Sequence, residues 1–228
     1  MYIRREHERG KADFGWLRSA HSFSFGQYYD PKHMGISVLR VINDDLVQPG
    51  KGFGTHGHRD MEIISYVVDG ELEHKDSYGN QSIIPAGDIQ VMSAGSGITH
   101  SEYNPSSSKT VNFLQIWITP NVRGIKPSYQ QMKINQDEPL TPLITPDGLG
   151  RTLSINQDAY LYRLTLIKGE KYILDTVDQC GYLHLVKGRV QIDDVRLSAG
   201  DAVGVGASRS VTIEAKEDIE ALWFLLPE

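Results

Sequence analysis

The chain has one cysteine, no long apolar run and no excess of positive charge. Cys180 stands alone among 228 residues, which excludes an internal disulfide and any metal site built from several thiolates. No stretch approaches the roughly 18 apolar residues of a membrane span, and the charged amino-terminal segment lacks the apolar region of a secretion signal. We therefore expect a cytoplasmic protein without membrane contacts, in which histidines and carboxylates hold any metal.

The formal net charge of −6 provides no basic surface for phosphates, so direct binding to DNA or RNA is not expected. A contact with a protein partner remains open. With 39% hydrophobic residues, the chain can bury a substantial core.

Short β-rich runs, such as "ISVLRVINDD", "VNFLQIWITP" and "GYLHLVKGRVQI", alternate with Gly, Pro, Asn and Asp. Helical periodicity is almost absent, which predicts an all-β sandwich or barrel. The segment from Pro120 to Asn156 differs, because it is polar and holds five prolines. Long regular strands are not expected there.

Two segments resemble each other and indicate an internal duplication. Gly70 in "YVVDGELEHKDSYGNQSIIPAGDIQV" corresponds to Gly188 in "HLVKGRVQIDDVRLSAGDAVGV", and each segment contains Ala-Gly-Asp at the same place in the order. The predicted organisation is an N-terminal metal-binding unit over residues 1–125, a linker over 126–156 and a C-terminal unit over 157–228. Neither alignment of the two copies yields a histidine pair in the second one at the positions of His56 and His58, so no metal site is expected there.

The segment "FGTHGHRDME" places two histidines one residue apart. On a strand, His56 and His58 share a face at a spacing of roughly 6–7 Å. His100 and Glu102 in "SGITHSEYNP" repeat this arrangement. Two such strands facing each other would bring three imidazoles and one carboxylate to a point.

This donor set leaves two positions open in an octahedral sphere and suits Fe, Mn, Co, Ni, Cu or Zn as a divalent ion. The ligand set does not choose among these metals, but adjacent open positions suit an oxygenase, and Fe(II) is the metal we expect. Glu62 is a rival fourth ligand, but it lies four residues beyond His58 and reaches the metal only if the chain bends. The spacing favours Glu102, and Glu62 then orients a histidine or forms a salt bridge.

Two other groups have simpler interpretations. His74, with Asp76 two residues further on, is expected to be a core or surface histidine rather than a metal contact. A cluster around "HSFSFGQYY" is expected in the core, with a substrate-pocket wall as the alternative; its members are His21, Phe23, Phe25, Tyr28 and Tyr29.

The sequence resembles the cupins and, within them, the pirins. A first cupin motif is matched by Gly50, His56, His58, Glu62 and Gly70, and a second, with a longer gap, by Gly79, Pro85, Gly87, His100 and Asn104. The gap contains "MSAGSGITHSE", which is similar to a pirin signature, and "HSFSFGQYYDP" also resembles pirins. Gly57 departs from the family, since many pirins have proline there.

The resemblance implies a bicupin of two jelly-roll β-barrels whose metal ligands are His56, His58, His100 and Glu102. Bacterial pirins of this type are similar to quercetin 2,3-dioxygenases, which implies that a flavonol and dioxygen are the substrates and carbon monoxide a product. Glu102 is the expected catalytic base, because it lies within reach of a metal-bound hydroxyl.

The alternative from the same family is a transcriptional co-regulator or metal redox sensor that acts through protein contacts and needs the same ligands. Another cupin reaction on an unknown small molecule, such as an isomerisation, is a third hypothesis. Fold alone does not choose among them.

Overall fold

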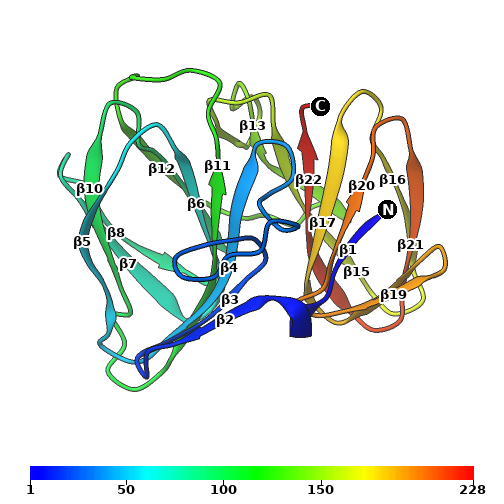
Figure 1. The fold of residues 1–228 in the computed structure, drawn as a ribbon, viewed down its shortest axis with the longest axis horizontal. Helices are drawn as coiled ribbons and strands as arrows, with labels where there is room; N and C mark the ends of the chain where they lie inside the picture. Colours follow the sequence, from blue (N-terminus) through cyan, green and yellow to red (C-terminus); the bar gives the residue numbers. More distant parts are fainter.

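The computed structural model describes residues 1–228, and it consists of strands with one turn of 3-10 helix, η1 (Glu6–Glu8), and no α-helix. The all-β prediction is therefore confirmed. Figure 1 shows two halves side by side, each made of facing sheets. Each half contains a seven-stranded and a four-stranded sheet rather than one closed barrel. No helix is long and apolar enough to cross a membrane.

The large sheet of the N-terminal half has the order β12-β9-β6-β11-β4-β3-β2, and its small sheet has the order β5-β10-β7-β8. The large sheet comprises β2 (Gly10–Asp13), β3 (Leu17–His21), β4 (Leu39–Val47), β6 (Glu62–Asp69), β9 (Asp88–Ser93), β11 (Val111–Ile118) and β12 (Ser128–Lys133). The small sheet comprises β5 (Gly52–His58), β7 (Glu71–Asp76), β8 (Gln81–Pro85) and β10 (Ile98–Tyr103).

The C-terminal half repeats this plan with the orders β1-β20-β17-β22-β15-β13-β14 and β16-β21-β18-β19. The large sheet comprises β1 (Tyr2–Arg4), β13 (Leu140–Thr145), β14 (Leu153–Ser154), β15 (Tyr160–Leu166), β17 (Cys180–Lys187), β20 (Ala202–Val205) and β22 (Ile219–Leu226). The small sheet comprises β16 (Lys171–Asp175), β18 (Arg189–Ile192), β19 (Val195–Ser198) and β21 (Ser210–Ala215). Only β13 and β14 pair in parallel.

Two features of this topology were not expected. The segment interpreted as a linker contains β12 and β13, of six residues each. β12 is an edge strand of the large sheet of the N-terminal half, and β13 belongs to the large sheet of the C-terminal half. The prolines permit this because Pro127 and Pro139 precede these strands, and Pro142 lies at a register shift against β15. In addition, β1 crosses from the amino terminus to the C-terminal half, where it pairs with β20.

The large N-terminal sheet is buried on both faces. Ile64 and Leu114 lie on its outer face, within a cluster of 22 buried residues that also contains Leu222 and Phe224 of the other half. Their neighbours along the strands, Ile63 and Phe113, belong to separate apolar clusters, because successive side chains of a strand alternate between faces. The two halves therefore share one apolar layer, while the N-terminal half keeps a second interior of its own.

The interior of the C-terminal half is filled with apolar side chains. A cluster of 16 buried residues occupies it, and Trp223 is its largest member. Gly181 makes room for this indole: a Cβ added at Gly181 would lie 2.0 Å from Cη2 of Trp223 and 2.8 Å from Cγ2 of Thr176. The second half thus has a solid core where the first has a site.

Replacing Gly181 with alanine should lower the free energy of unfolding by about 1–3 kcal/mol, because the added methyl group overpacks the core beside Trp223. Urea denaturation measures the change. Gly206→Ala is the matched control, since no atom lies within 4 Å of the Cβ added there. Equal stability of the two variants would contradict this account of the core.

His184 on β17 predicts a pH dependence of stability. Burial and, to a smaller extent, Arg9 lower the pKa of His184 to about 3, although Asp44 and Asp201 act in the opposite direction. An unfolded histidine titrates near pH 6.5, so between these values the unfolded chain binds a proton that the folded chain does not. The free energy of unfolding should therefore fall as the pH decreases from about 6.5 towards 3. His184→Gln should reduce the slope of the free energy of unfolding against pH by the equivalent of up to one bound proton. An unchanged slope, measured by denaturation at several pH values, would refute the assignment.

Candidate metal centre

Three histidines meet between β5 and β10. His100 pairs directly with His56 across the two strands, and His58 lies on the same face of β5. One nitrogen from each ring belongs to a group of atoms that all lie within 4.8 Å of one another, and the Nε2 atoms of His56 and His100 are 3.1 Å apart. The structure thus brings together the three histidines that the spacing of the two pairs singled out.

The ring states of these histidines suit a metal. Nδ1 of His56 lies 2.8 Å from the carbonyl oxygen of Gly54, so it donates its hydrogen there and Nε2 keeps a free lone pair. Burial and the neighbouring imidazoles lower the pKa of His58 to about 4 and that of His100 to about 2. Both rings are neutral at pH 7, and neutral imidazole is the ligand form.

Glu102 lies beside this cluster but outside it. Its side chain is fully buried on β10, two residues beyond His100, and a register shift separates the two positions. One carboxylate oxygen accepts a hydrogen bond of 3.1 Å from Ser65, and the other accepts one of 2.7 Å from Gln115. Burial raises the pKa of Glu102 to about 7. Ser65 and Gln115 belong to the large sheet, whereas the three histidines belong to the small sheet. The two donors therefore hold the carboxylate of Glu102 at the large sheet.

These donors belong to a row of polar side chains across the large sheet. Gln115 on β11 pairs with Ser65 on β6 and, on its other side, with Asn43 on β4; Asn43 pairs in turn with His21 on β3. Directly paired residues project from the same face of a sheet. The row Ser65, Gln115, Asn43 and His21 therefore runs along the interior face, away from Glu102.

Glu62 and His74 have other partners. The carboxylate of Glu62 accepts hydrogen bonds from Ser93 and from Asn156, so it ties the N-terminal large sheet to the segment leading into the second half. Of the two roles expected for Glu62, orienting a histidine or forming a salt bridge, neither is observed. His74 is fully buried, and its Nε2 lies 3.1 Å from Asp76, as expected for a core histidine.

A cavity of about 930 Å³ opens onto His56 and His58. Aromatic rings form part of its wall: Trp117 packs edge-on against His58, with ring centroids 5.0 Å apart, and against Phe25 at 5.4 Å. A site of this size with a few polar groups is typical of a small-molecule pocket. Its aromatic lining comprises Phe14, Trp16, Phe25, Tyr28, Phe53 and Trp117.

The aromatic cluster near the amino terminus divides between core and pocket. Phe23 is buried in the layer between the halves and Tyr29 is exposed, whereas His21, Phe25 and Tyr28 line the cavity. Sequence reasoning missed Trp117, Asn43 and Asp45 as cavity residues. Asn43 follows the apolar pair Val41–Ile42, and Trp117 lies between Ile116 and Ile118, but this pattern does not reveal which face of a strand encloses a cavity.

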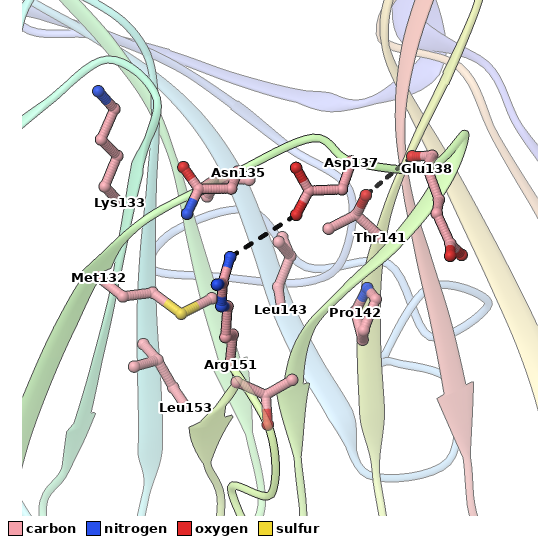
Figure 2. Close-up of a pocket in the computed structure, with 12 residues that line it drawn as sticks. Met132, Lys133, Asn135, Asp137, Glu138, Thr141, Pro142, Leu143, Arg151 and Leu153 are labelled. Atoms are coloured by element: carbon pink, nitrogen blue, oxygen red, sulfur yellow. Dashed lines mark hydrogen bonds and ion pairs between the residues drawn. The ribbon is translucent and has the colours of Figure 1, made fainter.

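A second cavity, of about 580 Å³, lies between β12 and β13, where the two halves meet. Figure 2 shows its apolar side chains, among them Met132 and Leu153, and Arg151 reaching across to Asp137 at 3.8 Å. It contains no histidine and lies apart from the imidazole cluster.

The residues of the imidazole cluster fit a divalent transition metal. Three neutral nitrogen donors converge, and imidazole ligands suit Fe, Ni, Cu and Zn. The nearby buried carboxylate, Glu102, supplies a compensating negative charge when ionised.

Protein freed of metal should bind one equivalent of Ni(II). His58→Gln should weaken this binding by on the order of a hundredfold or more, because a donor is lost from the cluster. His74→Gln should change the affinity little, because Nε2 of His74 is engaged by Asp76 and glutamine can also donate to that carboxylate. Calorimetric titration measures both, and equal losses would show that the cluster is assigned wrongly.

Comparison with known proteins supports this picture. Residues 3–118 match the Pirin family model, and residues 143–226 match the quercetinase C-terminal cupin domain. The chain is 45% identical over its full length to quercetin 2,3-dioxygenase of Escherichia coli K12, of which 99% is covered. It is 43% identical to a pirin-like protein of Caulobacter vibrioides, over 92% of this chain and 93% of that one.

Among solved structures, the bacterial pirin YhhW of Escherichia coli in complex with nickel(II) superposes with a TM-score of 0.95 and 45% identity. That match covers 99% of this chain and 98% of the other. The strand order, the imidazole cluster and the two family matches agree, and the chain belongs to the pirin family.

Proposed function

We propose that the protein is a metal-dependent dioxygenase that cleaves flavonols such as quercetin with dioxygen and releases carbon monoxide. The observation that carries this proposal is the aromatic cavity that opens onto His56 and His58, with Glu102 buried nearby. Its volume of about 930 Å³ accommodates a three-ring substrate. The names of the relatives, at 45% identity over the full length, support the same reaction.

The proposed ligands are His56, His58, His100 and Glu102, and the proposed native metal is Fe(II). When bound, the metal lowers the pKa of a coordinated hydroxyl and provides a path for electrons from the substrate to dioxygen. Nickel(II) is present in a related pirin, so Ni(II) is the first alternative. Glu102 must turn from Ser65 or Gln115 if it is to become the fourth ligand.

The side chains in and beside the cavity have distinct roles in this proposal. Glu102 accepts the proton of the substrate hydroxyl, since each of its oxygens has a lone pair beyond the bond it already accepts. Ser65 and Gln115 orient this carboxylate. Trp117 provides an aromatic wall beside His58, and its indole N–H has no partner and can donate to a substrate carbonyl. The apolar walls keep water from the reacting carbons.

Protein stripped of metal and reloaded with Fe(II), Mn(II), Co(II), Ni(II), Cu(II) or Zn(II) should release carbon monoxide from quercetin with at least one ion. Glu102→Gln should lower kcat by about 10²–10⁴-fold, because a general base is lost, while retaining metal on the three imidazoles. Gas-phase detection of carbon monoxide and metal analysis give the two values.

Glu62→Gln is the matched control for this substitution. It changes a carboxylate that is also buried but is engaged by Ser93 and Asn156 outside the cavity, so turnover should persist. Full activity in Glu102→Gln would exclude the assigned base. Absence of turnover with every metal, despite one bound equivalent, would exclude flavonol cleavage and favour a sensor.

A further inference from the structure

The cavity contains polar atoms that no protein group satisfies, and they lie together. Ser19 and His21 on β3 pair directly with Asp45 and Asn43 on β4, so these four side chains project from one face of two adjacent strands. All four line the cavity. The interior face of these strands therefore presents a polar surface, which we call the β3–β4 polar patch: Ser19, His21, Asn43 and Asp45.

Every member of the patch is at least nine-tenths buried. The exposed fractions are 6% for Ser19 and His21, 2% for Asn43 and 3% for Asp45. Nδ1 of His21 and Oδ1 of Asn43 have no hydrogen-bond partner in the protein. Ser19 pairs with Asp45, and its hydroxyl opposes the rise in the pKa of Asp45 to about 7 that burial causes. A buried polar atom without a partner destabilises the folded protein, so two such atoms at one place in a cavity mark groups that a bound molecule can satisfy.

The patch has a defined position relative to the candidate metal centre. From His58, the rings of Trp117, Phe25 and His21 follow one another, with consecutive centroids 5.0, 5.4 and 5.3 Å apart. Along the sheet, the row from Ser65 through Gln115 and Asn43 joins the position of Glu102 to His21. A planar aromatic molecule that reaches the histidines therefore extends over this row towards the patch.

The chemistry of the patch selects hydroxyl groups. Oδ1 of Asn43 accepts hydrogen bonds, the carboxylate of Asp45 accepts them when ionised, and the Ser19 hydroxyl and one form of the His21 ring can also accept. Phenolic hydroxyls donate, whereas an unsubstituted ring or a methyl ether has no hydrogen to offer. The surrounding aromatic rings supply contact area for any planar ligand, and the patch distinguishes ligands that carry a hydroxyl from those that lack it.

We propose that the β3–β4 polar patch is a specificity subsite that binds the phenolic hydroxyls of the substrate that lie farthest from the metal. This inference rests on the proposed function for the position of the substrate. The expected substrates are aromatic compounds that carry hydroxyls at both ends, not every planar compound with one hydroxyl for the metal.

The test measures binding rather than turnover, using quenching of the cavity tryptophans Trp16 and Trp117 in the Ni(II)-loaded protein. The probes are flavonols with two, one or no hydroxyls on the pendant phenyl ring, and a second series that lacks hydroxyls on the fused ring. In at least one series, removal of a hydroxyl that contacts the patch should raise the Kd about tenfold.

Asn43→Leu should remove this preference, because leucine keeps the approximate size of asparagine and offers no acceptor. We expect the Kd of the hydroxylated probe to rise about tenfold while the probe lacking that hydroxyl binds as before. Ile42→Val is the matched control, since Ile42 is the adjacent residue of β4 on the opposite face, in the layer between the halves. It can lower stability but should leave the ratio of the two Kd values unchanged.

The outcomes separate the two proposals. A Kd independent of hydroxylation in both series, or an equal change for all probes in Asn43→Leu, would overturn the subsite even if carbon monoxide is released. Hydroxyl-dependent binding that Asn43→Leu abolishes would support the subsite even if no metal gives turnover, and the proposed dioxygenase reaction would then fail alone.

Discussion

Burial of the large N-terminal sheet on both of its faces is the constraint on which the rest of the structure depends. Its outer face must be apolar throughout, because it meets the large sheet of the second half in a layer of 22 buried residues. Its inner face is also removed from water, but polar groups are tolerated there where a partner exists. Ser65 and Gln115 satisfy this condition by holding Glu102, whereas Nδ1 of His21 and Oδ1 of Asn43 in the β3–β4 polar patch have no partner within the protein. The site therefore lies where a row of polar side chains crosses the inner face of the large sheet in place of apolar ones.

The same constraint explains the contrast between the halves. Both have equivalent sheets, but the second has filled its interior with apolar side chains around Trp223. This solid half supports the first, whose cavity forfeits packing contacts that the second retains. Burial also determines the state of the histidines, since imidazoles crowded in a poorly hydrated space remain neutral and keep their lone pairs.

The sequence predicted that three histidines lie close together, but not what surrounds them. His56, His58 and His100 were found because the period of a strand is two residues, and this fixes which side chains share a face whatever the tertiary structure. The internal repeat likewise indicated two similar halves. Asn43 and His21 could not be found, because their meaning arises from a register between β3, β4 and β11 that is set by tertiary pairing. The strands in the proline-containing segment were missed because proline forbids only particular positions in a sheet, and here the prolines occupy the permitted ones.

The crossing of β1 has a consequence for how the chain is made. Residues Tyr2–Arg4 are synthesised 200 residues before their partner strand, Ala202–Val205. Synthesis proceeds at about 5–20 residues per second, so this first strand waits for roughly ten seconds or more with its backbone hydrogen-bonding groups unpaired. Closure between such distant segments is an entropically slow step. The large sheet of the N-terminal half pairs strands that are all made before β13, so it can form early in synthesis, whereas the second half receives its edge strand β1 only after β20 has been made.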